Sequence, residues 1–164
     1  ACSREPIFVP GTAFALADLL DHAAAPVSMP EGSIVMVTGG FKGRRSEVGA
    51  EDLLLAIGTR LPGVRIVGEY GMSELGSQLW SVPAEARFVP PPWMRVLAVD
   101  PWSGAPVEHG LLRFYDLANL HTVLAIETAD VGTVYPDGSL RLQGRLAQAR
   151  PRGCSLSVEE SHDR

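Results

Sequence analysis

Two short apolar runs with a helical pattern between them constrain the fold of this chain most. Ser33–Thr38 (SIVMVT) and Val64–Val67 (VRIV) are rich in β-branched residues, which is typical of buried strands. Between them, apolar residues recur on one face of an expected helix: Ala50, Leu54, Ile57 and Leu61. A strand–helix–strand unit predicts two parallel strands joined by a right-handed crossover. We therefore expect an α/β layer over residues 1–87.

Polar residues that can cap helices flank this unit. Thr12 is expected to cap an earlier helix whose apolar residues face a core: Phe14, Leu16, Leu19, Leu20 and Ala23. Ser46 is expected to cap the helix between the two strands, with Glu47 in its first turn. Pro62-Gly63 should end that helix.

The chain beyond about residue 88 has a different pattern, with short strand candidates separated by turn signals. The candidates are MRVLAV, LLRFY, TVLAI, GTVY and SLRL. Pro136-Asp137-Gly138 is a good hairpin loop, and Val89–Trp93 (VPPPW) is a stiff connector to the first half. Residues 88–146 are therefore predicted to form a small antiparallel, barrel-like subdomain, followed by an arm over residues 147–164.

Composition excludes several classes of protein. The net charge of −5 argues against nucleic acid as the main partner, and no stretch is long and apolar enough for a membrane helix. The N-terminus lacks the pattern of a signal peptide. The first residue is not Met, so we expect a processed, trimmed or excerpted chain. The two cysteines, Cys2 and Cys154, are a weak disulfide signal, which favours the cytoplasm.

Unusual residues follow both expected strands at their carboxyl ends, where parallel sheets bind ligands. The first strand ends in Thr38–Gly40 and the second leads into Tyr70–Glu74 (YGMSE). Glycines let a flat ligand approach the backbone, and Tyr70 offers a ring for stacking. Ser73 offers a hydroxyl to a phosphate oxygen, and Glu74 a carboxylate to Mg²⁺. The alternative is a plain turn into a helix capped by Ser73.

Five ordered stretches carry a family resemblance that runs from about Phe8 to Glu160: TGGFKGR, EYGMSELGSQ, DLANLHTVLAIETADVG, QGR and RGCSLS. YGMSE resembles the Tyr-Gly-x-Thr-Glu motif of the adenylate-forming, acyl-CoA synthetase superfamily. Together the stretches resemble the acyl-protein synthetase family, the long-chain-fatty-acid–protein ligases of bacterial bioluminescence and their relatives. The fold implied is part of an adenylation domain.

The resemblance implies an ATP- and Mg²⁺-dependent ligase that activates a fatty or other carboxylic acid. The acid and ATP give acyl-adenylate and pyrophosphate, and the acyl group then passes to a thiol. Gly39 and Gly40 match the loop that flanks the adenine. Tyr70 and Gly71 would line the adenine and acyl clefts.

The resemblance assigns phosphate, metal and ribose contacts as well. Ser73, in place of the superfamily threonine, would bond the α-phosphate, and Glu74 would bind Mg²⁺. Asp130 matches a carboxylate that accepts hydrogen bonds from both ribose hydroxyls. Arg145, in a Gly-Arg pair, would reach the ribose or a phosphate. The alternatives are a turn aspartate before Gly132 and a surface arginine.

Cys154 resembles the acyl-accepting cysteine that the family carries near its C-terminus. Arg150 and Arg152 would favour its thiolate, which is the nucleophilic form. The acyl group would then pass to a partner acyl reductase. The alternative is a buried cysteine that acts as a small hydrophobe.

Two departures from the superfamily pattern limit these expectations. No Ser/Thr/Gly-rich phosphate loop precedes YGMSE, and the single lysine, Lys42, lies far upstream of any lid position. We therefore expect the N-terminal half of the adenylation domain to be missing and this chain alone to be inactive. The alternatives are a fragment of a phenylacetate-type acyl-CoA ligase and a non-catalytic module that binds a nucleotide or a partner. The acid, the acceptor and the oligomeric state stay open.

Overall fold

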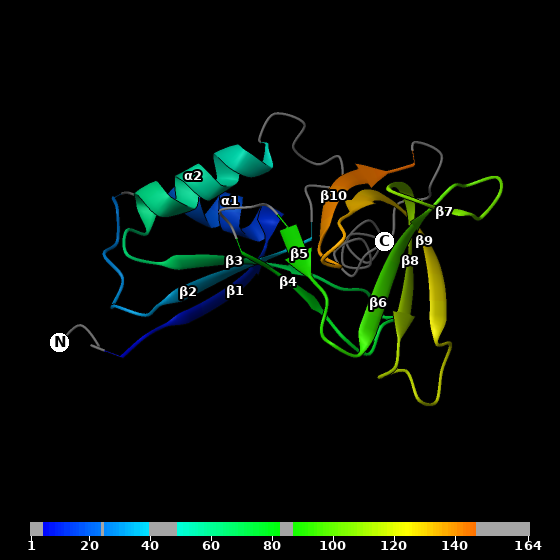
Figure 1. Ribbon diagram of the computed structural model, residues 1–164. Helices are drawn as coiled ribbons and strands as arrows, with labels where there is room; N and C mark the ends of the chain where they lie inside the picture. The colour runs from blue at the N-terminus through cyan, green and yellow to red at the C-terminus, as the bar shows by residue number, and fades with distance from the viewer. Residues whose placement is uncertain (1–4, 24, 40–48, 83–86, 147–164) are drawn as a thin grey trace, which may run out of the picture. The chain divides into compact units, whose positions relative to one another are not determined.

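The computed structural model describes residues 5–23, 25–39, 49–82 and 87–146. The chain divides into two compact units. The first unit comprises Ala1–Tyr70 and Leu79–Val89, and the second comprises Gly71–Gln78 and Pro90–Arg164 (Figure 1). Neither helix of the described part is long and apolar enough to span a bilayer.

The first unit has the predicted α/β character. Its elements are β1 (Phe8–Thr12), α1 (Ala13–His22), β2 (Ile34–Thr38), α2 (Ala50–Arg60), β3 (Arg65–Tyr70), β4 (Leu79–Val82) and β5 (Arg87–Val89). The strands lie in the order β1-β2-β3-β4-β5, with both helices along one face (Figure 1). The parallel pairing of β2 with β3 confirms the prediction, and β1 adds a third parallel strand. β4 and β5 then continue the sheet antiparallel.

Helix α1 confirms its predicted cap and corrects its predicted face. The Oγ1 of Thr12 accepts a hydrogen bond from the amide of Ala15 at 3.2 Å. Phe14 and Leu19, which were expected in the core, are instead 39% and 52% exposed. Leu16 and Leu20 are buried as predicted, and the same helix face also buries Ala13 and Ala17.

Helix α2 begins later than its predicted cap. Gly49 is the N-cap, and its amide donates to the carboxylate of Asp52 at 3.2 Å. Ser46 and Glu47, which were expected in the cap and first turn of this helix, lie outside the described residues. The buried face centres on Leu53 and Ile57, whereas Leu54 is only half-buried. These side chains join those of α1 and Val35 of β2 in one core.

The core under α2 supports a stability prediction with a control on the same helix. Ile57 is fully buried, whereas Leu55 is 73% exposed. Ile57→Ala should lower the free energy of unfolding by about 2–5 kcal/mol, because it removes packed methyl groups and leaves a cavity. Leu55→Ala should change it by no more than about 0.5 kcal/mol. Chemical denaturation of the two variants measures both, and equal losses would contradict this core assignment.

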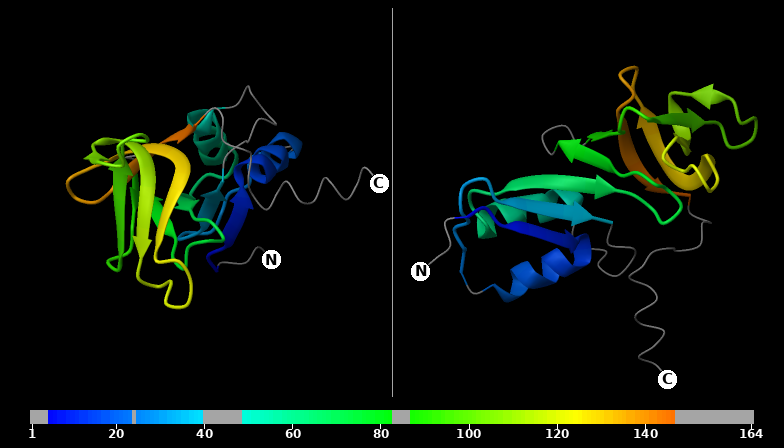
Figure 2. Two further views of the ribbon diagram at one scale, coloured as in Figure 1. Left: turned by 90° about the vertical axis from the view of Figure 1, so that its right-hand side faces the viewer. Right: turned by 90° about the horizontal axis from the view of Figure 1, so that it is seen from below.

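The second unit is an antiparallel sheet preceded by an irregular segment. Its strands are β6 (Met94–Val99), β7 (Pro106–Val107), β8 (His109–Asp116), β9 (Ala125–Val134) and β10 (Leu140–Arg145). They lie in the order β10-β9-β8-β6-β7, and neighbouring strands in this order are antiparallel (Figure 2). Among the described residues no pairing joins β7 to β10, so closure into a barrel-like subdomain is not supported.

The hairpin between β9 and β10 forms where the turn signal predicts it. The amide of Tyr135 donates to the carbonyl of Ser139 at 2.8 Å, and Gly138 has a φ of 83°. A left-handed residue at this position suits glycine, which has no Cβ to clash. The expected strands TVLAI and GTVY are not separate, since β9 is continuous from Ala125 to Val134.

Candidate functional site

The carboxyl ends of β2 and β3 meet, as the two parallel strands predict. Thr38 and Glu69 are partners in the β2–β3 register, and the hydroxyl of Thr38 donates to the carboxylate of Glu69. Gly39 follows directly with a φ of 65°. Gly40 lies outside the described residues. Glu69 was not predicted as a site residue, although its place directly before the YGMSE motif is the signal that could have suggested it.

Tyr70 is the last residue of β3, so the strand runs three residues beyond its predicted end at Val67. Its half-buried ring packs edge-on against Phe88 of β5, with 6.0 Å between ring centroids. Gly68 lies inside β3, and its amide donates to the Oγ of Ser81 at 2.8 Å. A Cβ on Gly68 would collide with that oxygen.

The site loop, residues 71–78, joins β3 to β4 and contains no helix. The alternative in which Ser73 caps a helix is therefore not what the structure contains. Ser73 and Glu74 are both exposed on this loop. Among the described residues no three His, Cys, Asp or Glu side chains gather as a metal centre. A lone carboxylate still fits Mg²⁺, which takes one or two carboxylates together with phosphate oxygens and water.

Asp130 and Arg145 lie together on neighbouring strands of the second unit. The Nε of Arg145 is 2.9 Å from the Oδ1 of Asp130, and Asp130 is the more buried of the two. Asp130 lies inside β9, so the alternative of a turn aspartate is not what the structure contains. Two residues from separate sequence motifs thus form one ion pair. A guanidinium beside a carboxylate offers donors and acceptors to a ribose and a phosphate.

A β-bulge places Arg145 opposite Asp130. Leu142 pairs with Gly132 in the β9–β10 register, yet the next pair is Gly144 with Val131. One extra residue on β10 shifts Arg145 into the position opposite Asp130, where unbroken register would put Gly144. Gly144 has a φ of 131°, a backbone conformation that glycine adopts readily. The bulge is therefore part of the local geometry of this pair.

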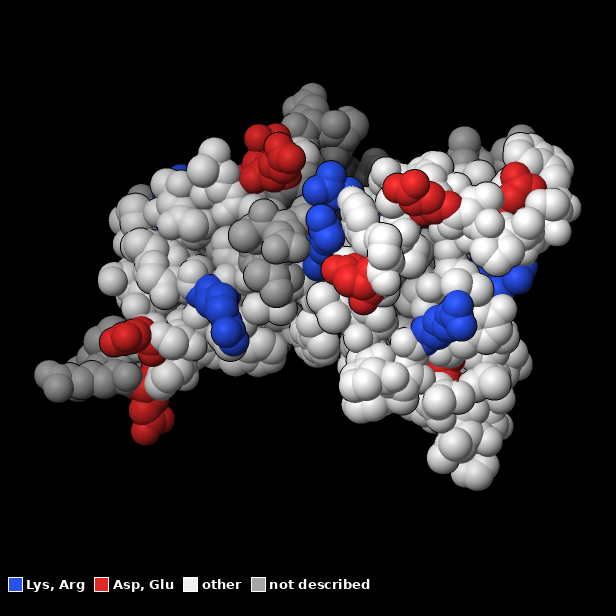
Figure 3. Space-filling model, in the orientation of Figure 1, with Lys and Arg blue, Asp and Glu red and all other residues white. Residues whose placement is uncertain are grey.

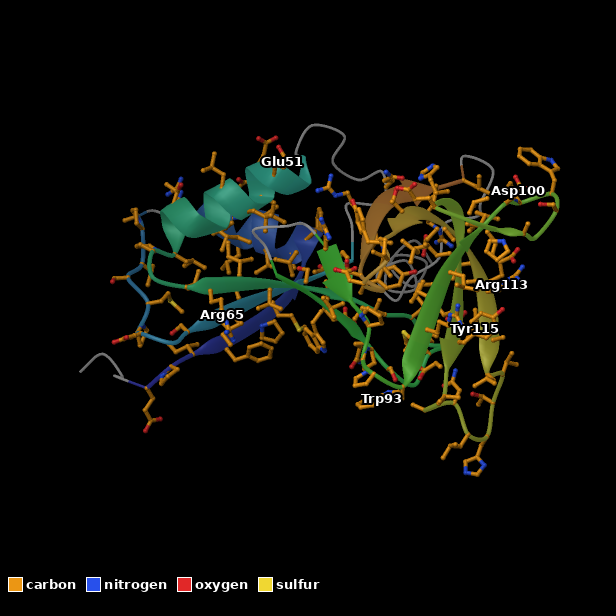
Figure 4. All side chains as sticks on the ribbon, in the orientation of Figure 1. Glu51, Arg65, Trp93, Asp100, Arg113 and Tyr115 are labelled. Atoms are coloured by element: carbon orange, nitrogen blue, oxygen red, sulfur yellow. The ribbon has the colours of Figure 1, made fainter. Side chains whose placement is uncertain are left out.

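A second ion pair on β9 was missed by sequence reasoning. The Nη2 of Arg113 on β8 is 2.6 Å from the Oε2 of Glu127 on β9. The hydrogen bonds from Arg113 to Glu127 raise the pKa of this guanidinium, and the side chain of Tyr115 contributes in the same direction. Figure 4 labels Arg113 and Tyr115 on β8, and Figure 3 shows acidic and basic side chains interspersed on the face in view. Glu127 can therefore serve as a control for Asp130, because both are carboxylates of β9 that pair with an arginine.

Several predicted residues lie outside the part of the chain that the structure describes. These are Gly40, Lys42, both cysteines (Cys2 and Cys154), and the arginines that flank Cys154. The predicted arm over residues 147–164 lies outside it as well. The assignment of Cys154 as the acyl acceptor therefore stays a prediction.

Comparison with known proteins relates the fold to a class of ligases. No family model and no curated protein matches the sequence. Among solved structures, an O-succinylbenzoate coenzyme A synthetase from Bacillus subtilis, in complex with ATP and magnesium ion, aligns with a TM-score of 0.62 and 18% identity over 90% of this chain. Coronafacic acid ligase from Pectobacterium brasiliense aligns with a TM-score of 0.56 and 14% identity over 84%. The N-terminal domain of FACL13 from Mycobacterium tuberculosis aligns with a TM-score of 0.59 and 15% identity over 85%.

The aligned chain spans 33%, 29% and 38% of these three structures, respectively. At such identities the likeness concerns the fold alone. The chain therefore shares its fold with a part, about one third in length, of each of these three structures.

Proposed function

We propose that this chain is part of an ATP-dependent ligase that activates a carboxylic acid as an acyl-adenylate. The observation that carries the proposal is the ion pair between Asp130 and Arg145. By their resemblance, the motifs ETADVG and QGR would each contribute one of these residues to the nucleotide site, and the two side chains lie 2.9 Å apart. The shared fold with a synthetase whose structure holds ATP and magnesium supports the same cofactors here.

The proposed reaction has two balanced steps. A carboxylate oxygen of the acid attacks the α-phosphorus of ATP, which forms the acyl-phosphate bond and releases pyrophosphate. A thiolate then attacks the acyl carbon, which forms a thioester and releases AMP. In the first step negative charge builds on the phosphate, and bound Mg²⁺ would stabilise it electrostatically.

Each site residue then has a chemical task. Ser73 would donate its hydroxyl to the α-phosphate, and Glu74 would hold Mg²⁺ from the same loop. The carboxylate of Asp130 would accept from the ribose hydroxyls, and Arg145 would hold that carboxylate in place while facing the ribose or a phosphate. Gly39, Gly40, Tyr70 and Gly71 would flank the adenine and the acyl group.

The finer proposal is the acyl-protein synthetase branch, with Cys154 as the thiol and a fatty acid as the substrate. The motif RGCSLS supports it, because Arg150 and Arg152 favour the thiolate electrostatically. A free thiolate requires a reducing compartment, so we place the reaction in the cytoplasm. The thioester would then pass its acyl group to a partner acyl reductase.

The second candidate is a coenzyme A ligase of the phenylacetate type, in which coenzyme A supplies the thiol. The names of the similar solved structures favour it, since they include a coenzyme A synthetase. A non-catalytic binding module is the candidate from another class. Acid-dependent release of pyrophosphate separates both ligases from that module, and the position of the acyl label separates one ligase from the other.

Asp130→Ala should weaken ATP binding to the full-length enzyme, with Glu127→Ala as the matched control. Both carboxylates lie on β9 and both pair with an arginine. Loss of hydrogen bonds to a charged acceptor costs about 1.5–3 kcal/mol, or about tenfold or more in the dissociation constant. Glu127→Ala should leave ATP affinity unchanged. Isothermal titration calorimetry with ATP and Mg²⁺ measures both, and equal affinities for the two variants would return Asp130 to a structural role.

A further inference from the structure

The site loop is tied to a single turn of the second unit. This turn, residues 116–124, begins at the last residue of β8 and is closed at its base by the amide of Asp116, which donates to the carbonyl of Leu124 at 3.0 Å. The amide of Asn119 also donates to the carbonyl of Asp116 at 3.1 Å. Loop and turn are far apart in sequence, so any contact between them is set by the fold.

The first tie holds the backbone of Glu74 itself. The Nδ2 of Asn119 donates to the carbonyl of Glu74 at 2.9 Å and to the carbonyl of Val123 at 3.2 Å. Gly76 permits this approach, because a Cβ there would lie 2.9 Å from the Oδ1 of Asn119 and 3.2 Å from the Cβ of Ala118. Asn119 therefore bridges the turn and the residue proposed to bind Mg²⁺.

The second tie holds the loop three residues further on. Ser77 is buried, and its Oγ donates to the Oδ1 of Asp116 at 2.9 Å while accepting from the Nε1 of Trp93 at 2.8 Å. Trp93 stands directly before β6, where Figure 4 labels it. The amide of Ala118 also donates to the Oδ1 of Asp116, at 3.0 Å. The loop is thus held at two points, one on each side of Gly76.

Asp116 places a carboxylate in a fully buried position, which is unusual for a residue with only a structural role. Its side chain is fully buried, and its Oδ2 has no hydrogen-bond partner among the described residues. A buried polar atom without a partner costs stability, so packing alone does not favour a carboxylate here. Its Oδ1 instead gathers donors from the site loop and from the turn.

We propose that Asn119, Ser77 and Asp116 are positioning residues that fix the loop carrying Ser73 and Glu74. This inference rests on the proposed function, because it treats that loop as the holder of the phosphate and its Mg²⁺. A site that binds a developing charge gains most when its donors and ligands are fixed before the substrate arrives. Ser73 and Glu74 are exposed on an irregular loop, and the contacts of Asn119 and Ser77 add rigidity to the turn that the amide of Leu75 closes onto the carbonyl of Met72 at 3.1 Å.

The test compares Asn119→Ala with Leu120→Ala in the full-length enzyme. Leu120 is the next residue of the turn and is 80% exposed, so its truncation is the matched control. The half-saturating Mg²⁺ concentration for acid-dependent pyrophosphate exchange should rise about 10- to 100-fold in Asn119→Ala, as for other residues that orient a metal ligand. Leu120→Ala should keep the value of the unaltered enzyme. Unchanged Mg²⁺ dependence in Asn119→Ala overturns the proposal.

Ser77 gives a second pair of variants should Asn119→Ala fail to fold. Ser77→Ala removes the hydroxyl that meets Asp116 and Trp93, whereas Ser77→Thr retains a hydroxyl. We expect the alanine variant to shift the Mg²⁺ dependence and the threonine variant to restore it. Equal behaviour of the two variants contradicts a positioning role.

Hydrogen exchange separates failure of this inference from failure of the proposed function. In the chain itself, Asn119→Ala should accelerate amide exchange over residues 72–76, whereas Leu120→Ala should not. An enzyme without any exchange of pyrophosphate would refute the proposed ligase, and faster amide exchange in Asn119→Ala alone would still support the tie to the loop. Unchanged exchange of these amides in Asn119→Ala would refute the claim that Asn119 holds the site loop.

Discussion

The isolated 164-residue chain is expected to give no acid-dependent exchange of pyrophosphate into ATP. The superfamily places a Ser/Thr/Gly-rich phosphate loop well upstream of the motif that YGMSE resembles, and the sequence holds no such loop. Ser73 and Glu74 would therefore contact the α-phosphate and Mg²⁺ without the groups that hold the departing pyrophosphate. Because electrostatic stabilisation by fixed donors is usually the largest catalytic effect, its loss should bring the rate to background.

The measurement uses labelled pyrophosphate, ATP, Mg²⁺ and carboxylic acids of several chain lengths. The O-succinylbenzoate synthetase from Bacillus subtilis, with its own acid, is the positive control for the assay. Equilibrium dialysis of ATP with the isolated chain adds a second result, since any retained nucleotide binding would disfavour a pure interaction module. Robust exchange by the chain alone would show that it contains a complete adenylation site.

Cys154→Ser should abolish the acyl thioester in the full-length enzyme while leaving acyl-adenylate formation intact. The thiol takes no part in the first step, so pyrophosphate exchange should keep its rate. Transfer of the acyl group to a partner reductase should disappear, because a serine hydroxyl at neutral pH is a far weaker nucleophile than a thiolate. We therefore expect complete loss of acyl transfer and an unchanged rate of acyl-adenylate formation.

Mass spectrometry after incubation with ATP and a labelled fatty acid locates the acyl group. Trypsin should release Cys154 in the peptide 153–164 and Cys2 in a separate peptide that ends at Arg4, so the two cysteines are read separately. We expect a label that neutral hydroxylamine removes from the first peptide and no label on the second. Label that appears only on added coenzyme A would replace the acyl-protein proposal by the coenzyme A ligase.

Local sequence patterns predicted the elements that carry strong periodicity. The parallel pair β2 and β3, the Thr12 cap and the Pro136–Gly138 hairpin all form as expected. β1 was missed because Pro10 and Gly11 lie inside it and both are poor strand formers. β3 was cut short for a similar reason, since Gly68 resembles the start of a loop until its close contact with Ser81 is known.

The sequence suggested which residues belong to the candidate site, but it predicted only in part which of them lie together. The meeting of Thr38 with the end of β3 follows from parallel pairing alone. The pairing of Arg145 with Asp130 depends on a bulge that no periodicity reveals, and the bond from Asn119 to Glu74 joins residues 45 positions apart. Such contacts depend on tertiary structure. Side-chain chemistry therefore suggests which residues could contribute to a site, but not which residues contact one another.

The two prolines inside end strands have a consequence for how this sheet behaves in a crowded solution. Pro10 lies in β1, the end strand of the first unit, and Pro106 lies in β7, the two-residue end strand of the second. Proline has no amide hydrogen, so each edge offers one donor fewer to a foreign strand. Unpaired edges are the usual starting points of aggregation, and the chain blunts these two with residues that cannot extend the hydrogen-bond ladder.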